Sequence, residues 1–99
     1  MKPVVVARLF IMGLMTGTNY KILWDPTSDV YFVRVQNHIV GECRRSWYPV
    51  ANNDYTIRQL MKDDDLRIRD KEKFEELKKR LKSGSAPSDM ESIRTEDRQ

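Results

Sequence analysis

The sequence is poor in the residues that build metal centres, disulfides and nucleophilic sites. Among its 99 residues there is one cysteine, Cys43, and one histidine, His38. A single cysteine excludes an internal disulfide, and one histidine with one cysteine falls short of the three or four ligands that zinc needs. A cysteine nucleophile would also need a base held against it by the fold. We therefore expect no metal, no cofactor and a reducing, cytoplasmic setting.

Motifs of catalysis are absent as well. The chain has no glycine-rich phosphate loop, no serine, histidine and aspartate in a triad order, and no nucleotide-binding fingerprint. Three adjacent carboxylates occur at residues 63–65. Neighbouring helical side chains diverge by about 100°, so these three do not form a magnesium site among themselves. We expect a protein that is not an enzyme.

The chain has one long apolar run, residues 4–15, which Arg8 interrupts. The run is too short and too charged to span a bilayer, and no small-residue cleavage pattern of a signal peptide follows it. We expect no membrane association. A valine triplet favours a strand over Val4–Phe10, with a buried helix as the alternative, because periodicity does not separate the two in a uniformly apolar run.

The strongest structural pattern lies in residues 20–45. Runs rich in β-branched and aromatic side chains are broken by turn formers at residues 25–28 and again at residues 37–38. The pattern predicts a three-stranded antiparallel meander. Side chains alternate along each strand, so one face of the meander is apolar and directed to the core, and the other is mixed.

A helical region follows a loop that composition predicts over residues 46–54. Thr56 and Gln59 have the spacing of a capping box, and carboxylates at residues 63–65 oppose a helix dipole. We therefore expect a first helix that starts with Thr56 as its cap and ends before these carboxylates. A second helix is expected from Asp70 to Lys82, with Asp70 as its cap. One long helix through the carboxylates is the alternative.

Together these elements predict an α+β fold. It consists of a small antiparallel sheet, which the N-terminal strand would join, packed by one or two C-terminal helices. We expect one domain over residues 1–82. Residues 83–99 are mostly small, polar and charged, so their composition predicts a disordered polar tail.

Basic and aromatic side chains gather on the mixed face of the meander and just after it. Residues 1–50 hold six Lys and Arg against three Asp and Glu, whereas the rest of the chain is balanced. Arginines and aromatics are enriched at protein interfaces, and the same types contact phosphates and stack on bases. The candidate partner-binding residues are Lys21, Phe32, Arg34, Arg44, Arg45, Trp47 and Tyr48. The structural alternative is that Trp47 and Tyr48 close a thin core while Arg44 and Arg45 solvate a strand edge.

We expect a non-catalytic regulatory protein that binds and modulates a host or cellular protein, a type common in phages and other mobile elements. The alternative is a small nucleic-acid-binding protein that uses a basic and aromatic sheet face, for which a steep loss of affinity with salt would be diagnostic. An uncovered strand edge would also allow two copies to pair as a homodimer.

Overall fold

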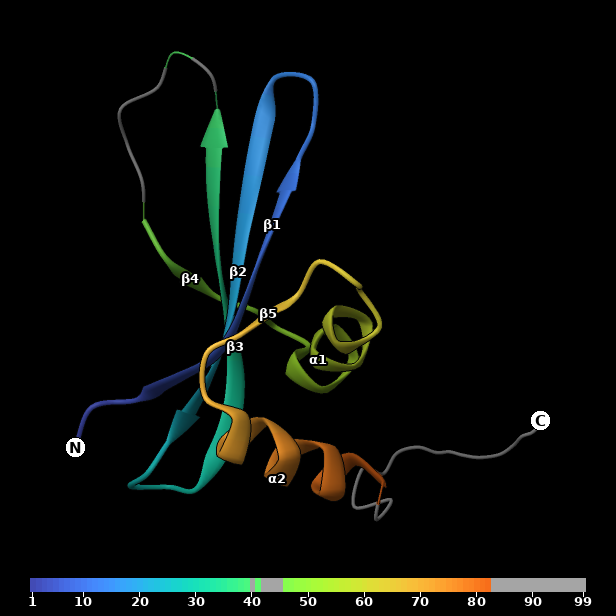
Figure 1. Ribbon diagram of the computed structural model, residues 1–99. Helices are drawn as coiled ribbons and strands as arrows, with labels where there is room; N and C mark the ends of the chain where they lie inside the picture. Colours follow the sequence, from blue (N-terminus) through green and yellow to red (C-terminus); the bar gives the residue numbers. More distant parts are fainter. Residues whose placement is uncertain (40, 42–45, 83–99) are drawn as a thin grey trace.

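The computed structural model describes residues 1–39, 41 and 46–82, and within them it has a five-stranded antiparallel sheet and two α-helices (Figure 1). In chain order the elements are β1 (Val4–Met12), β2 (Thr16–Asp25), β3 (Val30–Ile39), β4 (Tyr48–Pro49), α1 (Asn53–Met61), β5 (Arg67–Ile68) and α2 (Lys71–Lys82). The strand order across the sheet is β4-β3-β2-β1-β5. The predicted α+β class and the predicted N-terminal strand are confirmed.

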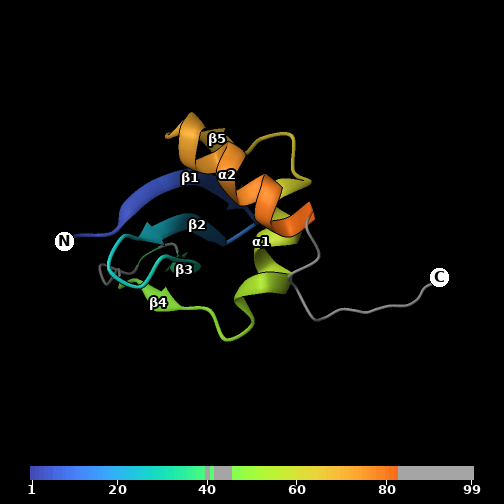
Figure 2. The same cartoon turned by 90° about the horizontal axis from the view of Figure 1, so that it is seen from below.

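The sheet and the helices form two layers. Both helices lie on one face of the sheet, as Figure 2 shows from below, and none of the described helices covers the opposite face. The core lies between the layers, and its buried members are Val6, Ala7, Leu9, Ile22, Val33, Ile57, Leu60, Phe74 and Leu77. In the described part of the chain, no helix is long and apolar enough to cross a membrane.

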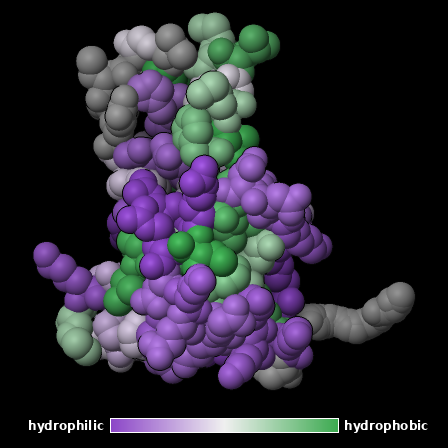
Figure 3. Space-filling view, viewed as in Figure 1, coloured by the Kyte–Doolittle hydropathy of each residue, from purple (hydrophilic) through white to green (hydrophobic). Residues whose placement is uncertain are grey.

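The hairpin of β1 and β2 extends past both helices (Figure 1). Its turn is closed by a hydrogen bond of 2.7 Å from the N–H of Gly13 to the carbonyl oxygen of Thr16. Figure 3 shows apolar residues at the free end of the molecule, at the top of the view. This end of the hairpin therefore lies outside the core.

β1 contains a bulge at Val6. The register of β1 with β2 shifts between Val5 and Ala7, and the side chain of the extra residue, Val6, is fully buried. The carbonyl oxygen of Val6 accepts hydrogen bonds from the N–H groups of Arg69 and Asp70, at 2.8 and 3.1 Å. These bonds attach the chain between β5 and α2 to the sheet.

The turn predicted at residues 37–38 is wrong, because β3 continues through Asn37 and His38 to Ile39. Asn37 lies opposite Thr18, and His38 lies opposite Gly17, in the register of β2 and β3. The hydroxyl of Thr18 also donates to the amide oxygen of Asn37 at 3.3 Å. Pairing with a long neighbouring strand has overridden the local turn tendency of the two residues.

The meander is therefore displaced toward the N-terminus relative to the prediction. It consists of β1, β2 and β3, and β2 starts at Thr16, earlier than predicted. The third strand that was predicted to follow residues 37–38 is not found among the described residues. Ile39 is the last residue of β3, and Gly41 lies in a turn with a φ of +93°, which glycine tolerates. Residues 40 and 42–45 lie outside the described residues.

The loop predicted over residues 46–54 contains two structured parts. Tyr48–Pro49 forms β4 at an edge of the sheet, where a proline without an N–H is tolerated. Beyond it, the N–H of Val50 donates to the carbonyl oxygen of Val33 at 3.1 Å, and the N–H of Val33 donates to the side chain of Asn53 at 2.9 Å. The edge of β3 is thus bonded by the chain that leads into α1.

α1 begins earlier than the predicted cap at Thr56. Its N-cap is Asn52, whose side-chain oxygen accepts from the N–H of Tyr55 at 3.4 Å. The N–H of Thr56 already donates to the carbonyl oxygen of Asn52 at 3.1 Å, so Thr56 lies inside the first turn. α1 ends at Met61, and its C-cap Lys62 precedes the carboxylates of residues 63–65, as predicted.

Two separate helices are present, which rules out the single long helix. The short strand β5, for which the sequence had no signal, lies between them. The carboxylate of Asp70 accepts from the N–H of Lys73 at 3.1 Å, which confirms Asp70 at the start of α2. The hydroxyl of Tyr31 lies 2.9 Å from Oε1 of Glu76 and 3.1 Å from the carbonyl oxygen of Lys73, so α2 is bonded to β3. Burial, together with the Glu76 carboxylate, raises the pKa of Tyr31.

Candidate functional site

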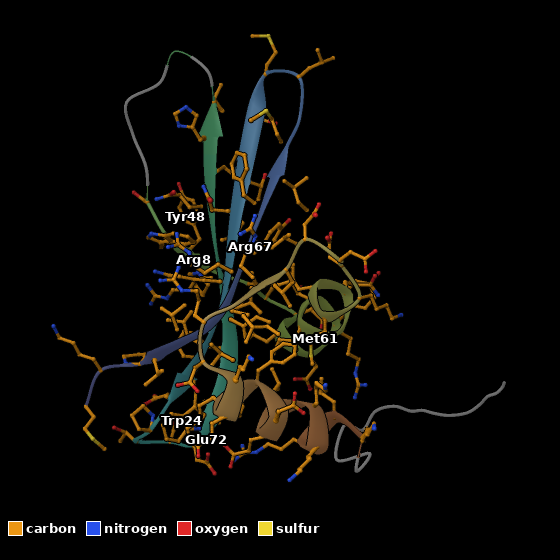
Figure 4. All side chains as sticks on the ribbon, in the orientation of Figure 1. Arg8, Trp24, Tyr48, Met61, Arg67 and Glu72 are labelled. Atoms are coloured by element: carbon orange, nitrogen blue, oxygen red, sulfur yellow. The ribbon has the colours of Figure 1, made fainter. Side chains whose placement is uncertain are left out.

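The face of the sheet opposite the helices, the helix-free face, collects the basic side chains of four strands. Arg8 of β1 lies opposite Lys21 of β2, and Lys21 lies opposite Arg34 of β3. Arg67 of β5 lies opposite Arg8. Directly opposed residues of antiparallel strands point to the same face, so these four cations form one row across the sheet, which we call the basic row. Figure 4 shows Arg8 and Arg67 together, away from Met61 of α1.

The basic row points away from the core. The next row of opposed residues, which is fully buried, consists of Ala7, Ile22 and Val33. Because successive side chains of a strand point to opposite faces, the row that follows must point to the uncovered side. The three arginines of the basic row are accordingly exposed, and Lys21 is half-buried.

Like charges repel one another along the basic row. Burial, and then the charges of Arg8 and Arg34, lower the pKa of Lys21. These causes all act in one direction, as expected for a lysine that has no carboxylate of the described residues beside it. Like charges directly opposite one another also destabilise a sheet. The fold therefore contains an unfavourable interaction that an anionic ligand would relieve.

By the register of the described strands, Asp25 is the one carboxylate on the helix-free face, and it lies at the end of β2. Its oxygens accept from the N–H of Thr27 at 3.0 Å and from the hydroxyl of Ser28 at 2.9 Å, and these bonds lower its pKa. Both bonds lie within the turn that follows β2, so the Asp25 carboxylate stabilises this turn. Among the described residues, no cation of the basic row is ion-paired with a carboxylate.

Trp47 lies against the basic row. The Nζ atom of Lys21 is 4.0 Å from the centroid of the Trp47 ring, a cation–π contact. Trp47 precedes β4, in which Pro49 lies opposite Arg34, so strand alternation also places the indole on the helix-free face. The ring covers one side of the lysine and contributes to its burial.

The next row toward the hairpin turn is aromatic and polar. Asn19 lies opposite both Phe10 and Gln36, and its amide donates to Oε1 of Gln36 at 3.4 Å. The half-exposed ring of Phe10 lies over Gly17, where an added Cβ would approach its Cζ to 2.7 Å. A hollow of about 250 Å³ adjoins both rows and is lined by Arg8, Leu9, Phe10, Asn19, Arg67 and Arg69. Cations, an exposed ring and amide groups thus share one surface.

Four of the predicted partner-binding residues lie on the helix-free face, namely Lys21, Phe32, Arg34 and Trp47. Tyr48 lies opposite Val35, which points to the helix side, so Tyr48 is not grouped with them. Arg44 and Arg45 lie outside the described residues. Whether any of the seven binds a partner stays a prediction.

Two residues of the basic row, Arg8 and Arg67, were not predicted as site residues. The signal for Arg8 was present, because a single charge in an apolar strand marks a position that faces solvent. Arg67 lies in a strand of two residues, which is too short to leave a pattern. Its place beside Arg8 follows only from the pairing of β5 with β1.

Other parts of the molecule are less suited to a ligand. In residues 1–39, 41 and 46–82, no three His, Cys, Asp or Glu side chains gather as a metal site would require. A hollow of about 590 Å³ lies along α2 and is lined by Glu72, Lys73, Glu75, Glu76 and Lys79. Its mixed charges largely balance, in contrast to the basic row.

No family model matches the sequence, and no curated protein and no solved structure matches the chain.

Proposed function

We propose that this chain is a non-catalytic protein that binds single-stranded nucleic acid on the helix-free face. The observation that carries the proposal is the basic row of Arg67, Arg8, Lys21 and Arg34, which no described carboxylate neutralises. This was the alternative function expected from the sequence, and the two arginines from β1 and β5 now favour it. A cytoplasmic setting, inferred from the single cysteine, belongs to the same proposal.

A polyanion fits the basic row better than a single anion does. Neighbouring strands lie about 4.8 Å apart, so a row across four strands spreads its charges over about 14 Å. A chain of phosphates laid across the strands would meet several cations at once, and each contact would release counterions. Three of the four cations are guanidinium groups, which bind phosphate oxygens through two parallel hydrogen bonds.

The surroundings of the row favour a single strand over a duplex. The exposed ring of Phe10 offers a surface on which an unpaired base can stack, and the amides of Asn19 and Gln36 suit base edges. None of the described helices stands on this face to enter a major groove. We assign Trp47 to positioning Lys21, because one side of its ring is already covered by the lysine.

A salt titration with oligothymidylate, which does not pair with itself, tests the proposal. If four phosphates are contacted, the logarithm of affinity should fall with the logarithm of salt concentration at a slope of about −3. The double variant Arg8→Gln and Arg34→Gln should lose about tenfold or more in affinity. The matched control, Lys71→Gln and Lys79→Gln on α2, removes the same charge from exposed positions and should bind like the wild type. Absence of wild-type binding at low salt would overturn the proposal.

A second candidate is the regulatory function expected first, docking on an acidic protein surface. Trp47 favours it, because an indole held against Lys21 resembles the rigid aromatic anchors of protein interfaces. In that case polyglutamate should bind the chain and oligothymidylate should not. Binding of oligothymidylate alone would favour the first candidate.

A further inference from the structure

The free end of the β1–β2 hairpin carries a cluster of exposed apolar side chains. Its members are Phe10, Ile11, Met12, Leu14 and Met15, and the side chain of Leu14 is fully exposed. Figure 3 shows the apolar surface at this end of the molecule. Contiguous apolar surface on a protein usually marks an interaction site.

The hairpin also lacks the charges that protect free sheet edges. Residues 9–20 contain no Asp, Glu, Lys or Arg, in a chain of which 33% is charged. β5 covers the outer edge of β1 at Ala7 and Arg8. Beyond them, among the strands that the structure describes, Leu9–Met12 pairs with β2 alone. An uncharged apolar edge of this kind is a template for another strand.

We propose that the outer edge of β1 pairs with the same edge of a second copy of this chain, about a two-fold axis at Ile11. A two-fold axis perpendicular to the sheet makes the two strands antiparallel and sets the residue at the axis opposite its own copy. With Ile11 at the axis, Phe10 lies opposite the partner's Met12, and Leu9 lies opposite the partner's Gly13. The pairing extends the sheet and does not depend on the proposed nucleic-acid binding.

The position of β5 limits how far the two strands can overlap. An axis at Phe10 would set the partner's Met12 opposite Arg8, where β5 already occupies the edge. With the axis at Ile11, the partner's strand reaches its turn at Gly13 just before β5 begins. Opposed residues share a face, so Phe10 and the partner's Met12 both lie on the helix-free face.

The charges of two copies permit this pairing. Within β1, Arg8 is the charged residue nearest to the free edge, and the two copies of Arg8 lie on opposite sides of the axis. At about 3.4 Å per residue they are about 20 Å apart. Physiological salt screens charges over about 8 Å, so the two copies repel only weakly. Residues 9–20 of a second copy carry no charge either, so the paired strands bring no further charge to this edge.

Charge substitution at the axis tests the proposal. The wild-type chain should sediment at twice the monomer mass of 11.7 kDa. Ile11→Lys sets two lysines opposite one another and Ile11→Glu sets two glutamates, so each variant alone should be monomeric. A mixture of the two should form a dimer again, because lysine then faces glutamate. The control Val30→Lys, at an exposed strand position on the far end of β3, should remain dimeric.

Three results would overturn the proposal, namely a monomeric wild type at its highest soluble concentration, dimers of both single variants, or a mixture that stays monomeric. Circular dichroism checks that each variant is folded. If the charged variants unfold, Ile11→Cys in a Cys43→Ser background should form an intermolecular disulfide on oxidation, and Val30→Cys in that background should not. Failure of a folded Ile11→Cys variant to cross-link would also overturn the register.

Discussion

Arg80 of α2 donates to Asp29 in the turn between β2 and β3 through two nitrogens. Its Nη2 lies 2.7 Å from Oδ1 of Asp29, and its Nη1 lies 2.9 Å from the Asp29 carbonyl oxygen. Oδ1 also accepts from the indole N–H of Trp24 at 2.8 Å. The hydrogen bond from Trp24, followed by that from Arg80, lowers the pKa of Asp29. The last turns of α2 are thus attached to the sheet by a charged contact.

Asp29→Asn should make the stability of the protein less sensitive to acid. A carboxylate whose pKa is lowered by folding contributes stability that is fully present above its ordinary value of 3.8 and is lost as the pH falls through the lowered value. Asparagine tolerates the backbone φ of +57° found at this position but carries no charge for Arg80. Thermal unfolding should show a less stable variant at neutral pH and a smaller difference below pH 3.8. An equal difference in stability at both pH values would contradict the role of the Asp29 carboxylate as the partner of Arg80.

Tyr31→Phe should destabilise the protein by about 1 kcal/mol, because a part-buried hydroxyl that donates its proton to α2 is removed. Urea unfolding measures the change. Tyr55→Phe is the matched control, since Tyr55 is exposed and its hydroxyl makes no hydrogen bond with the described residues. If both variants lose the same stability, the contact of Tyr31 with α2 contributes nothing specific.

Ile57→Ala should cost about 2–5 kcal/mol, because Ile57 is almost completely buried between α1 and the sheet and truncation leaves a cavity. Ile68→Ala changes the same residue type at an exposed position of β5, so its cost should stay within about 0.5 kcal/mol. Denaturant unfolding of the two variants compares them. Similar losses would place the core elsewhere than between the two layers.

Arg8→Gln should raise the stability of the protein and weaken its binding of the ligand. Removal of this guanidinium relieves repulsion on Lys21, so the melting temperature should rise. The same change removes one phosphate contact, so the salt slope for oligothymidylate should become shallower by about 0.7. Lys79→Gln on α2 should alter neither quantity. A lower melting temperature for Arg8→Gln would mean that Arg8 supports the fold rather than a ligand.

Strand alternation in the sequence correctly placed Lys21 and Arg34 on one side of the meander, because the pleat of a strand sends successive side chains to opposite faces wherever the strand pairs. Apolar spacing likewise located α2, and the adjacent carboxylates located the end of α1. The sequence by itself therefore determined the fold class, the strand character of β2 and β3, the position of α2 and one half of the basic row.

The tertiary structure alone decided the strand boundaries and the completed row. Asn37 and His38 have turn-forming character, yet they extend β3 because β2 supplies hydrogen-bonding partners along their full length. Arg67 lies beside Arg8 because β5 pairs with β1, although the two strands are far apart in the sequence. Such pairings depend on the register between segments far apart in the sequence. Local propensity carries no information about this register, because burial of the shared core determines which residues of the two strands lie opposite one another.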